Sequence, residues 1–314
     1  MYDEIDFSQF LDNNFGWAGA DRAILERALS EAPPELVQPL QIYGDKPPLE
    51  HLMLFRLTRK VLGKDTENFP QKTGDCTAFG AKNVGEYLEC CQIVMGSISN
   101  FRPIFPCYTY GTGRMIGHML GNGAGCVGIY IAQSANQYGF IARDDDNVPE
   151  YSKQVAEEWG RDKSAFEKFI PTGKEHLVKK IAKVSSWSDL LASITNLYPV
   201  TVASDYGFTQ KPMRDGYHHR EGSWSHQMAI IGIDDGDQDK GIEPHACVLN
   251  SWGLNAMGEP VKDFRDPNLI WPGGTLRVRK RDIEGMLAQN DSWAYSSFDD
   301  FHSQPLPDNF FDQL

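Results

Sequence analysis

A cysteine lies at the junction between a turn-forming segment and a long run of helical periodicity. Gly74 and Asp75 favour a turn, and Asp75 is also a good helix N-cap. After Cys76, apolar residues recur at steps of three and four, at Ala81, Val84, Leu88, Cys91 and Val94 or Met95. We therefore expect a helix that begins close to Cys76. The partial positive charge at a helix start favours the thiolate, which is the nucleophilic form of cysteine.

Two downstream segments hold side chains that can act together with this cysteine. His226 opens an apolar, β-like run, and Asn250 follows a second such run. The histidine comes 150 residues after the cysteine (226−76), and the asparagine a further 24 residues on (250−226). This order is typical of sites in which a histidine activates a cysteine and an amide orients the histidine. The alternative is a cysteine that only packs in the core, as most helical cysteines do.

Three motifs together resemble the papain-like cysteine peptidases: Gln71 shortly before Gly-Asp-Cys-x-Ala-Phe-Gly, the strand-borne His226, and the Asn-Ser-Trp-Gly block that begins at Asn250. The resemblance implies an α+β fold of two lobes, one helical and one β-barrel-like, with the cleft between them. It implies that Cys76 attacks a peptide or amide carbonyl to form a thioester, with His226 moving the proton. Asn250 would orient the imidazole, Trp252 would line the cleft and shield that hydrogen bond, and Gln71 would donate to the oxyanion.

A glycine-rich turn lies between the cysteine and the histidine segments. Its letters Gly123-x-Gly125-x-x-Gly128 match a dinucleotide fingerprint, but that reading requires a strand before the turn, and residues 114–118 are a poor strand. Papain-like enzymes place such a turn beside the cleft, where it pairs with an extended substrate, and follow it with a helix ending in Tyr-Gly. Residues 129–138 fit this helix. The resemblance thus assigns substrate binding to Asn122, Gly123, Ala124 and Gly125, where glycine allows close approach.

Together, the turn, the Trp-Ser-His block and the Asn-Ser-Trp-Gly block resemble a papain-like subgroup of tailed bacteriophages and some bacteria, from about residue 70 to residue 302. Three positions depart from the peptidase pattern. Gln71 stands five residues before Cys76 instead of six, and Thr77 replaces an aromatic residue. The Asp75 carboxylate would raise the pKa of the neighbouring thiol if it faced inward, and would have no such effect as an N-cap.

The sequence pattern divides the chain into four segments. Residues 1–50 form an N-terminal arm with a short helix from Asp21 to Ala32, and the arm either packs on the domain or inhibits it. Residues 51–198 are expected to form the helical lobe. Short β-like runs then begin, so residues 199–302 are expected to form the β-rich lobe. Residues 303–314 form a proline-rich tail that docks either on this domain or on a neighbouring chain.

Two further stretches of the expected helical lobe carry helical patterns. Residues 177–181 are amphipathic, and residues 187–197 follow a Ser-x-x-Asp capping box at Ser186. We therefore expect both stretches to be helical and to pack around the lobes.

Composition and charge limit the partners and the compartment. The net charge of −13 repels phosphate backbones and anionic lipids, so we expect neither nucleic acid nor a membrane as partner. No apolar run approaches the roughly 20 residues of a membrane span. The acidic N-terminus lacks the features of a secretory signal, so we expect a cytoplasmic protein with six free cysteines, in the host cytoplasm or in a virion if it is phage-encoded.

The expected function is a cysteine peptidase or amidase that acts on peptide or protein substrates and needs no cofactor and no metal ion. The alternative is a papain-like fold that serves mainly as a structural or assembly component, as in a bacteriophage particle. In that case residues 303–314 would contact other chains of the assembly. The two functions are compatible, because a particle protein can also cleave.

Overall fold

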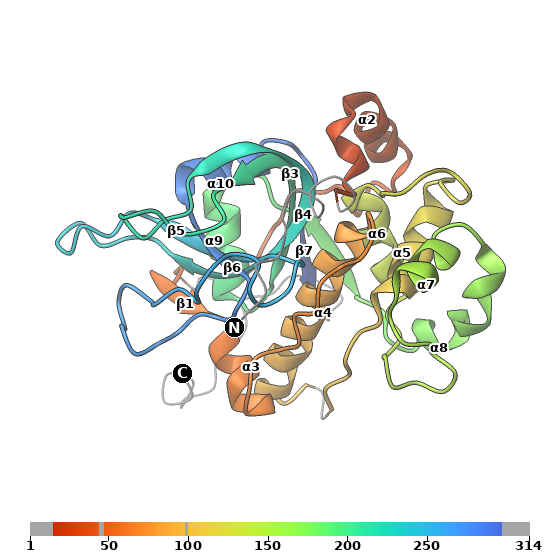
Figure 1. Ribbon diagram of the computed structural model, residues 1–314, viewed down its shortest axis with the longest axis horizontal. Helices are drawn as coiled ribbons and strands as arrows, with labels where there is room; N and C mark the ends of the chain where they lie inside the picture. Colours follow the sequence, from red (N-terminus) through yellow and green to blue (C-terminus); the bar gives the residue numbers. More distant parts are fainter. Residues whose placement is uncertain (1–14, 44–46, 98–99, 297–314) are drawn as a thin grey trace.

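Helices and antiparallel strands occupy two separate lobes, with the long helix α4 (Cys76–Val94) between them (Figure 1). The structure is a computed structural model and describes residues 15–43, 47–97 and 100–296. The expected α+β architecture of two lobes is confirmed. Within these residues, no helix has the length and apolar character needed to span a bilayer.

The helical lobe is built on two helices that pack together and against α4. Its elements are α5 (Pro106–Ile116), α6 (Gly128–Gln137), α7 (Lys153–Trp159), η2 (Lys163–Ala165), η3 (Glu167–Phe169) and α8 (Ile170–Lys174). A separate aromatic core fills this lobe, in which the Trp159 and Phe169 rings stack with centroids 5.3 Å apart. Aromatic pairs of this kind contribute packing energy beyond the area they bury.

Helix α5 was not expected, because glycine-rich segments disfavour helices. Its glycines allow close packing. A Cβ at Gly111 would lie 2.8 Å from the carbonyl oxygen of Trp159, and one at Gly113 would lie 2.4 Å from Cδ1 of Ile131. Because a helix and not a strand precedes the glycine-rich turn, the dinucleotide-binding alternative is excluded.

The other lobe is an antiparallel sheet with strand order β2-β7-β3-β4-β5-β6, and β1 pairs with β4. The strands are β1 (His51–Met53), β2 (Lys180–Lys183), β3 (Val200–Phe208), β4 (Arg220–Asp234), β5 (His245–Leu249), β6 (Thr275–Arg279) and β7 (Ser292–Ser296). The expectation of a helix at residues 177–181 was wrong, because Lys180 to Lys183 pair with β7. Four residues are too few to fix a period, so tertiary pairing decided the structure.

The remaining helices lie around the helical lobe and the sheet. They are η1 (Ala18–Ala20), α2 (Arg22–Glu31), α3 (Phe55–Leu62), α9 (Trp187–Thr195) and α10 (Lys280–Leu287). The expected helices in the arm and after Ser186 are confirmed. Asp21 caps the first by accepting hydrogen bonds from two backbone N–H groups, and Ser186 and Asp189 form the capping box of the second.

Helix α4 is buried on nearly all sides, because the sheet covers one side and the helical lobe the other. It even buries a Lys82–Glu86 ion pair, with the ammonium and carboxylate 2.8 Å apart and one helical turn apart in sequence. A buried charge requires a partner of this kind. The start of α4 therefore lies at the boundary of the two lobes, and Cys76 is its first residue.

Candidate active site

Cys76 lies at the N-terminus of α4, as the sequence predicts, and is fully buried. Asp75 occupies the N-cap position, but its side chain makes no capping hydrogen bond, so of the two alternatives for this carboxylate the structure favours the inward-facing one. Its carboxylate instead accepts a hydrogen bond of 2.8 Å from the Tyr151 hydroxyl. Burial raises the pKa of the Asp75 carboxyl to about 7, and the same carboxylate raises the pKa of the Cys76 thiol.

His226 and Asn250 meet at adjacent strands of the sheet. The histidine lies within β4, and the asparagine directly follows β5, which pairs with β4. His226 Nε2 lies 2.8 Å from Asn250 Oδ1, an oxygen that also accepts from the backbone N–H of Ser251. Because this oxygen can only accept, Nε2 must donate, and the lone pair of a neutral imidazole is on Nδ1. Nδ1 is buried and has no hydrogen-bond partner.

The histidine strand runs beside the start of the nucleophile helix. The side-chain Nε2 of Gln227 donates to the carbonyl of Thr77 at 3.1 Å, and its backbone N–H lies on the Cys76 side, where it favours the thiolate. The residue after the histidine thereby contacts both the cysteine and the next residue of α4. The structure thus brings the cysteine, histidine and asparagine segments together from distant parts of the sequence.

Gln71 and Trp252 both lie at this junction. Gln71 is buried, its Oε1 accepts from the hydroxyl of Ser251, and its Nε2 donates to the carbonyl of Thr73 at 2.9 Å. Trp252 lies against the His226 imidazole, with ring centroids 4.8 Å apart, and is itself buried. An indole in this position excludes water from the imidazole, and water exclusion strengthens hydrogen bonds within a site.

The glycine-rich turn borders the nucleophile loop. A Cβ at Gly74 would lie 3.1 Å from the Ala124 side chain, so the two segments are in contact. Asn122, Gly123 and Ala124 are exposed, whereas Gly125 is buried and has a φ of 100°, which favours glycine.

Arg114, which the sequence analysis missed, holds this turn in place. Its guanidinium donates to the carbonyls of Asn122, Gly123 and Gly125. An arginine shortly before a glycine-rich stretch is a signal that could have found it, because a turn leaves several backbone carbonyls free to accept from its five donors.

The N-terminal arm crosses the site. We call residues 15–18 the covering segment. The Cys126 N–H donates to the Gly16 carbonyl (2.8 Å), the Ala18 N–H donates to the Cys126 carbonyl (2.9 Å), and the Trp17 N–H donates to the Ser225 carbonyl (3.0 Å). The backbone N–H of Gly16 also favours the Cys76 thiolate and lowers the pKa of the thiol, an effect smaller than that of burial. The covering segment thus pairs with the glycine-rich turn on one side and the histidine strand on the other.

Burial under this segment sets the charge state of the site. It raises the pKa of the Cys76 thiol to about 12 and lowers the pKa of the His226 imidazole to about 4. Near neutral pH the covered site therefore holds a thiol and a neutral imidazole. The expectation of a thiolate from the helix start was wrong for this state, because desolvation outweighs the helix dipole.

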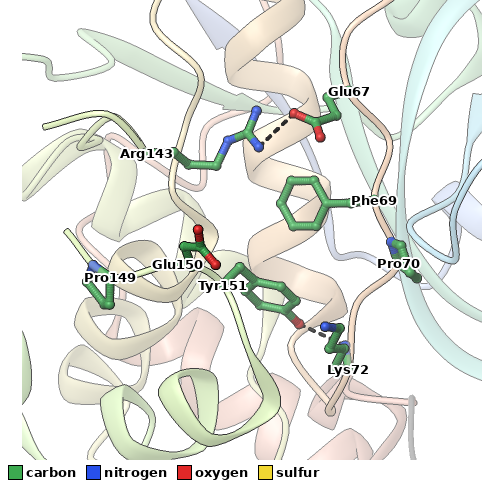
Figure 2. A pocket seen from close by; sticks show the side chains of 8 residues that line it. All are labelled: Glu67, Phe69, Pro70, Lys72, Arg143, Pro149, Glu150 and Tyr151. Carbon is green, nitrogen blue, oxygen red and sulfur yellow. Dashed lines mark hydrogen bonds and ion pairs between the residues drawn. The ribbon is translucent and has the colours of Figure 1, made fainter.

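A cavity of about 470 Å³ adjoins the loop that leads to Cys76 (Figure 2). The Phe69 and Tyr151 rings lie between the Arg143–Glu67 ion pair and Lys72 (Figure 2). None of the cysteine, histidine, asparagine or glutamine side chains of the site lines it. The Tyr151 hydroxyl links the cavity to the site, because it accepts from the Lys72 N–H and donates to the Asp75 carboxylate, which precedes the cysteine.

Among the described residues, no three His, Cys, Asp or Glu side chains are grouped to hold a metal ion. The candidate site contains a thiol at a helix start and an imidazole held by an amide. The Gln71 side chain and the Cys76 backbone N–H are candidate donors for an oxyanion, so the set is suited to acyl transfer.

Comparison with known proteins gives a fold and not a sequence family. No protein-family model and no curated protein matches the sequence. Among solved structures, xylellain, a cysteine protease from Xylella fastidiosa, is similar with a TM-score of 0.55 and 12% identity over 84% of this chain and 97% of that one. Procathepsin L 3 of Tenebrio molitor larval midgut has a TM-score of 0.54 and 13% identity over 92% and 85% of the two chains.

A third similar structure is procathepsin B S9 from Trypanosoma congolense, with a TM-score of 0.55 and 10% identity over 93% of this chain and 89% of that one. These identities are too low to carry function across, but the alignments span nearly all of each chain. The protein therefore has the two-lobe fold of the papain-like cysteine proteases.

Proposed function

We propose that the protein is a cysteine peptidase or amidase, with Cys76 as nucleophile, His226 as general base and acid, and Asn250 as the residue that orients the imidazole. The observation that carries this proposal is the 2.8 Å hydrogen bond between His226 Nε2 and Asn250 Oδ1. It leaves a buried lone pair on His226 Nδ1, and the next residue, Gln227, donates a hydrogen bond to the carbonyl of Thr77, the neighbour of Cys76. The fold shared with cysteine proteases supports the same chemistry.

In the first half of the reaction, His226 Nδ1 takes the thiol proton and the sulfur attacks the carbonyl carbon of the substrate. The negative oxygen that forms accepts hydrogen bonds from the Cys76 backbone N–H and the Gln71 amide. The C–N bond then breaks, the imidazolium gives its proton to the leaving amine, and a thioester remains. In the second half, His226 takes a proton from water, the hydroxide attacks the thioester, and the thiol leaves with that proton.

Substrate would bind as an extended chain beside Asn122, Gly123, Ala124 and Gly125, with Trp252 on the histidine side. The covering segment occupies this place in the structure, so we propose that the described conformation is latent. Two of the similar proteins are named as pro-forms, which supports a latent state. Release of the segment would return water to the site and bring the pKa values of thiol and imidazole together.

The test is a peptide chloromethyl ketone, which alkylates a cysteine that a neighbouring imidazole activates. We expect one adduct, on Cys76, and its loss in the Cys76→Ala variant. His226→Ala should abolish the ketone adduct while a small general reagent such as iodoacetamide still reacts with Cys76. Cys126→Ala, which removes another buried thiol nearby, is the matched control and should change nothing. Labelling of another cysteine, or undiminished ketone labelling in the His226→Ala variant, would refute the proposal.

Several finer expectations stay predictions. Residues 303–314, the proposed contact with other chains of an assembly, lie outside the described residues. Deleting them should prevent incorporation into a particle while Cys76→Ala leaves it intact, if the protein is an assembly component. Membership of the phage and bacterial subgroup, residence in the cytoplasm or a virion, and the segment boundaries at residues 50, 198 and 302 are likewise untested.

A further inference from the structure

Trp17 fills a side-chain site within the candidate cleft. The residue is 2% exposed, and its backbone pairs with Ser225, the residue before the candidate base. Its indole N–H donates a 2.7 Å hydrogen bond to Asp291 Oδ2. Asp291 directly precedes β7 and is fully buried. The covering segment therefore shows where a chain bound in the cleft would place one of its side chains. Trp17 occupies this side-chain site, and Asp291 lies at its inner end.

A second acceptor borders the same site. A Cβ on Gly128 would lie 2.5 Å from Gln227 Oε1 and 2.7 Å from Asp291 Oδ1, so both oxygens converge on the first residue of α6. Gln227 is completely buried, and its Oε1 has no hydrogen-bond partner. A buried acceptor without a donor is destabilising, because it has lost its hydrogen bond to water and gained none in return. Trp17 offers a single N–H, which goes to the carboxylate, so the amide oxygen remains unsatisfied.

The carboxylate has donors but no counter-ion. Besides Trp17, it accepts from the Gly128 N–H (2.7 Å) and the Trp293 indole N–H (2.7 Å). No arginine or lysine within the described residues forms an ion pair with it. Burial raises the pKa of the Asp291 carboxyl, although the Ile129 N–H also favours its anion, so the carboxylate has hydrogen bonds but no positive charge to neutralise it. The buried carboxylate and the buried amide oxygen lie side by side. Together they form a site for a ligand group with several N–H donors and a positive charge.

We propose that Asp291 and Gln227 bind the side chain of the substrate residue that takes the place of Trp17, and that they select arginine there. This inference rests on the function proposed above. Guanidinium carries five N–H donors in a planar fork, so it can serve both acceptors, whereas an indole serves one. It also supplies the missing charge, and its flat face suits a slot that holds an indole. Lysine brings the charge but not the fork, and should rank second.

The first test needs no catalysis, because the chain itself presents residue 17. Trp17→Arg and Trp17→Met are compared, each with Asp291 intact and with Asp291→Asn, by the rate at which iodoacetamide reaches Cys76. We expect Trp17→Arg to protect the cysteine about tenfold or more better than Trp17→Met, and this advantage to disappear with Asp291→Asn. Asp263→Asn, which also removes a buried carboxylate bound to an indole N–H, should keep the advantage.

Each comparison is the ratio of the alkylation rates of Trp17→Arg and Trp17→Met with the same residue at position 291. A general loss of stability through Asp291→Asn therefore cancels from the ratio. A thermal melt of each variant verifies that it folds. Equal protection by Trp17→Arg and Trp17→Met would overturn the proposal. An advantage that survives Asp291→Asn would overturn it as well, because another group would then bind the guanidinium.

The second test uses blocked peptides that differ at one position between arginine and its neutral isostere citrulline, with the covering segment loosened by Gly16→Ala. Cleavage should favour arginine about tenfold or more, and Asp291→Asn should remove the preference. Cleavage without any preference for arginine would refute the side-chain site and leave the peptidase intact. Protection by Trp17→Arg without cleavage of any peptide would support the site and refute the peptidase.

Discussion

Gly16→Ala should uncover Cys76. A Cβ at residue 16 would lie 2.0 Å from the carbonyl oxygen of Gly74, 2.3 Å from its carbonyl carbon and 2.8 Å from its Cα. Ordinary contact begins at 3.4 Å, so the covering segment must move by 1.4 Å (3.4−2.0). No rotamer change relieves this overlap, because all three atoms are backbone.

The expected size of the effect follows from what that shift breaks. Three backbone hydrogen bonds of 2.8–3.0 Å hold the covering segment to Cys126 and Ser225. A displacement of this size carries them out of range, and each contributes about 0.5–1.5 kcal/mol. Their loss weakens the hold on the cleft by about 1.5–4.5 kcal/mol. At about 1.4 kcal/mol per factor of ten, the uncovered fraction rises between about tenfold and a thousandfold.

The assay is the pseudo-first-order rate of Cys76 alkylation by iodoacetamide near neutral pH, followed by peptide mass spectrometry. In the wild type, reaction requires brief opening of the covering segment, so the rate follows the uncovered fraction. It is further slowed because burial holds the pKa of the thiol at about 12. Gly16→Ala should accelerate alkylation of this cysteine by at least about tenfold and leave that of Cys91 unchanged.

The matched control is Gly63→Ala, at the C-cap of α3. Gly63 has a φ of 70°, and a Cβ there meets nothing within 4 Å, so the substitution adds backbone strain without any clash. It should lower thermal stability and leave Cys76 alkylation unchanged. If Gly16→Ala alkylates no faster than the wild type, the covering segment does not control access to the thiol, and the latent state proposed above is refuted.

Three further predictions concern the site and its support. Gln71→Ala should lower kcat about 100-fold or more with little change in KM, measured on any peptide the protein cleaves, and an unchanged kcat would remove Gln71 from the oxyanion site. Asp75 has a folded pKa of about 7 against an ordinary 3.8, so the folded state binds the extra proton and stability from this group falls as pH rises between these values. Asp75→Asn should flatten that fall in denaturant unfolding curves, and an unaltered pH dependence would count against a buried carboxyl. Gly111→Ala should cost about 1–3 kcal/mol of unfolding free energy because α5 must retreat from the Trp159 carbonyl, whereas a neutral effect would contradict that packing.

Helical periodicity and capping residues predicted the parts of the fold that depend on residues close in sequence. The helix after Asp75 begins at Cys76, and the capping box at Ser186 opens α9. The two-lobe class came from the resemblance to the papain-like peptidases, and the separation of helical and strand patterns along the chain agrees with it. Strand β2 could not be found in this way, since it owes its form to β7 more than a hundred residues later (292−183).

The candidate site likewise contains residues that the sequence indicates and residues that it does not. The residues with a strong chemical signature, Cys76, His226 and Asn250, are predicted from the sequence, and the structure brings their segments together. Asp291 and the covering segment were missed, because nothing local marks a carboxylate that an indole from the other end of the chain will meet. The protonation state of the Cys76 thiol was also missed. The helix start, which favours the thiolate, can be predicted from the sequence, but the burial that outweighs it comes from distant segments.

The order of the strands has a consequence for biogenesis. Strand β7 lies between β2 and β3, yet it is translated after both, so on the ribosome these two strands wait for the neighbour that joins them. Asp291, which holds the Trp17 indole, arrives with that same late strand. A nascent chain therefore contains Cys76, His226 and Asn250 before it contains Asp291, so the covering segment can be fastened through Trp17 only after these three residues have been made.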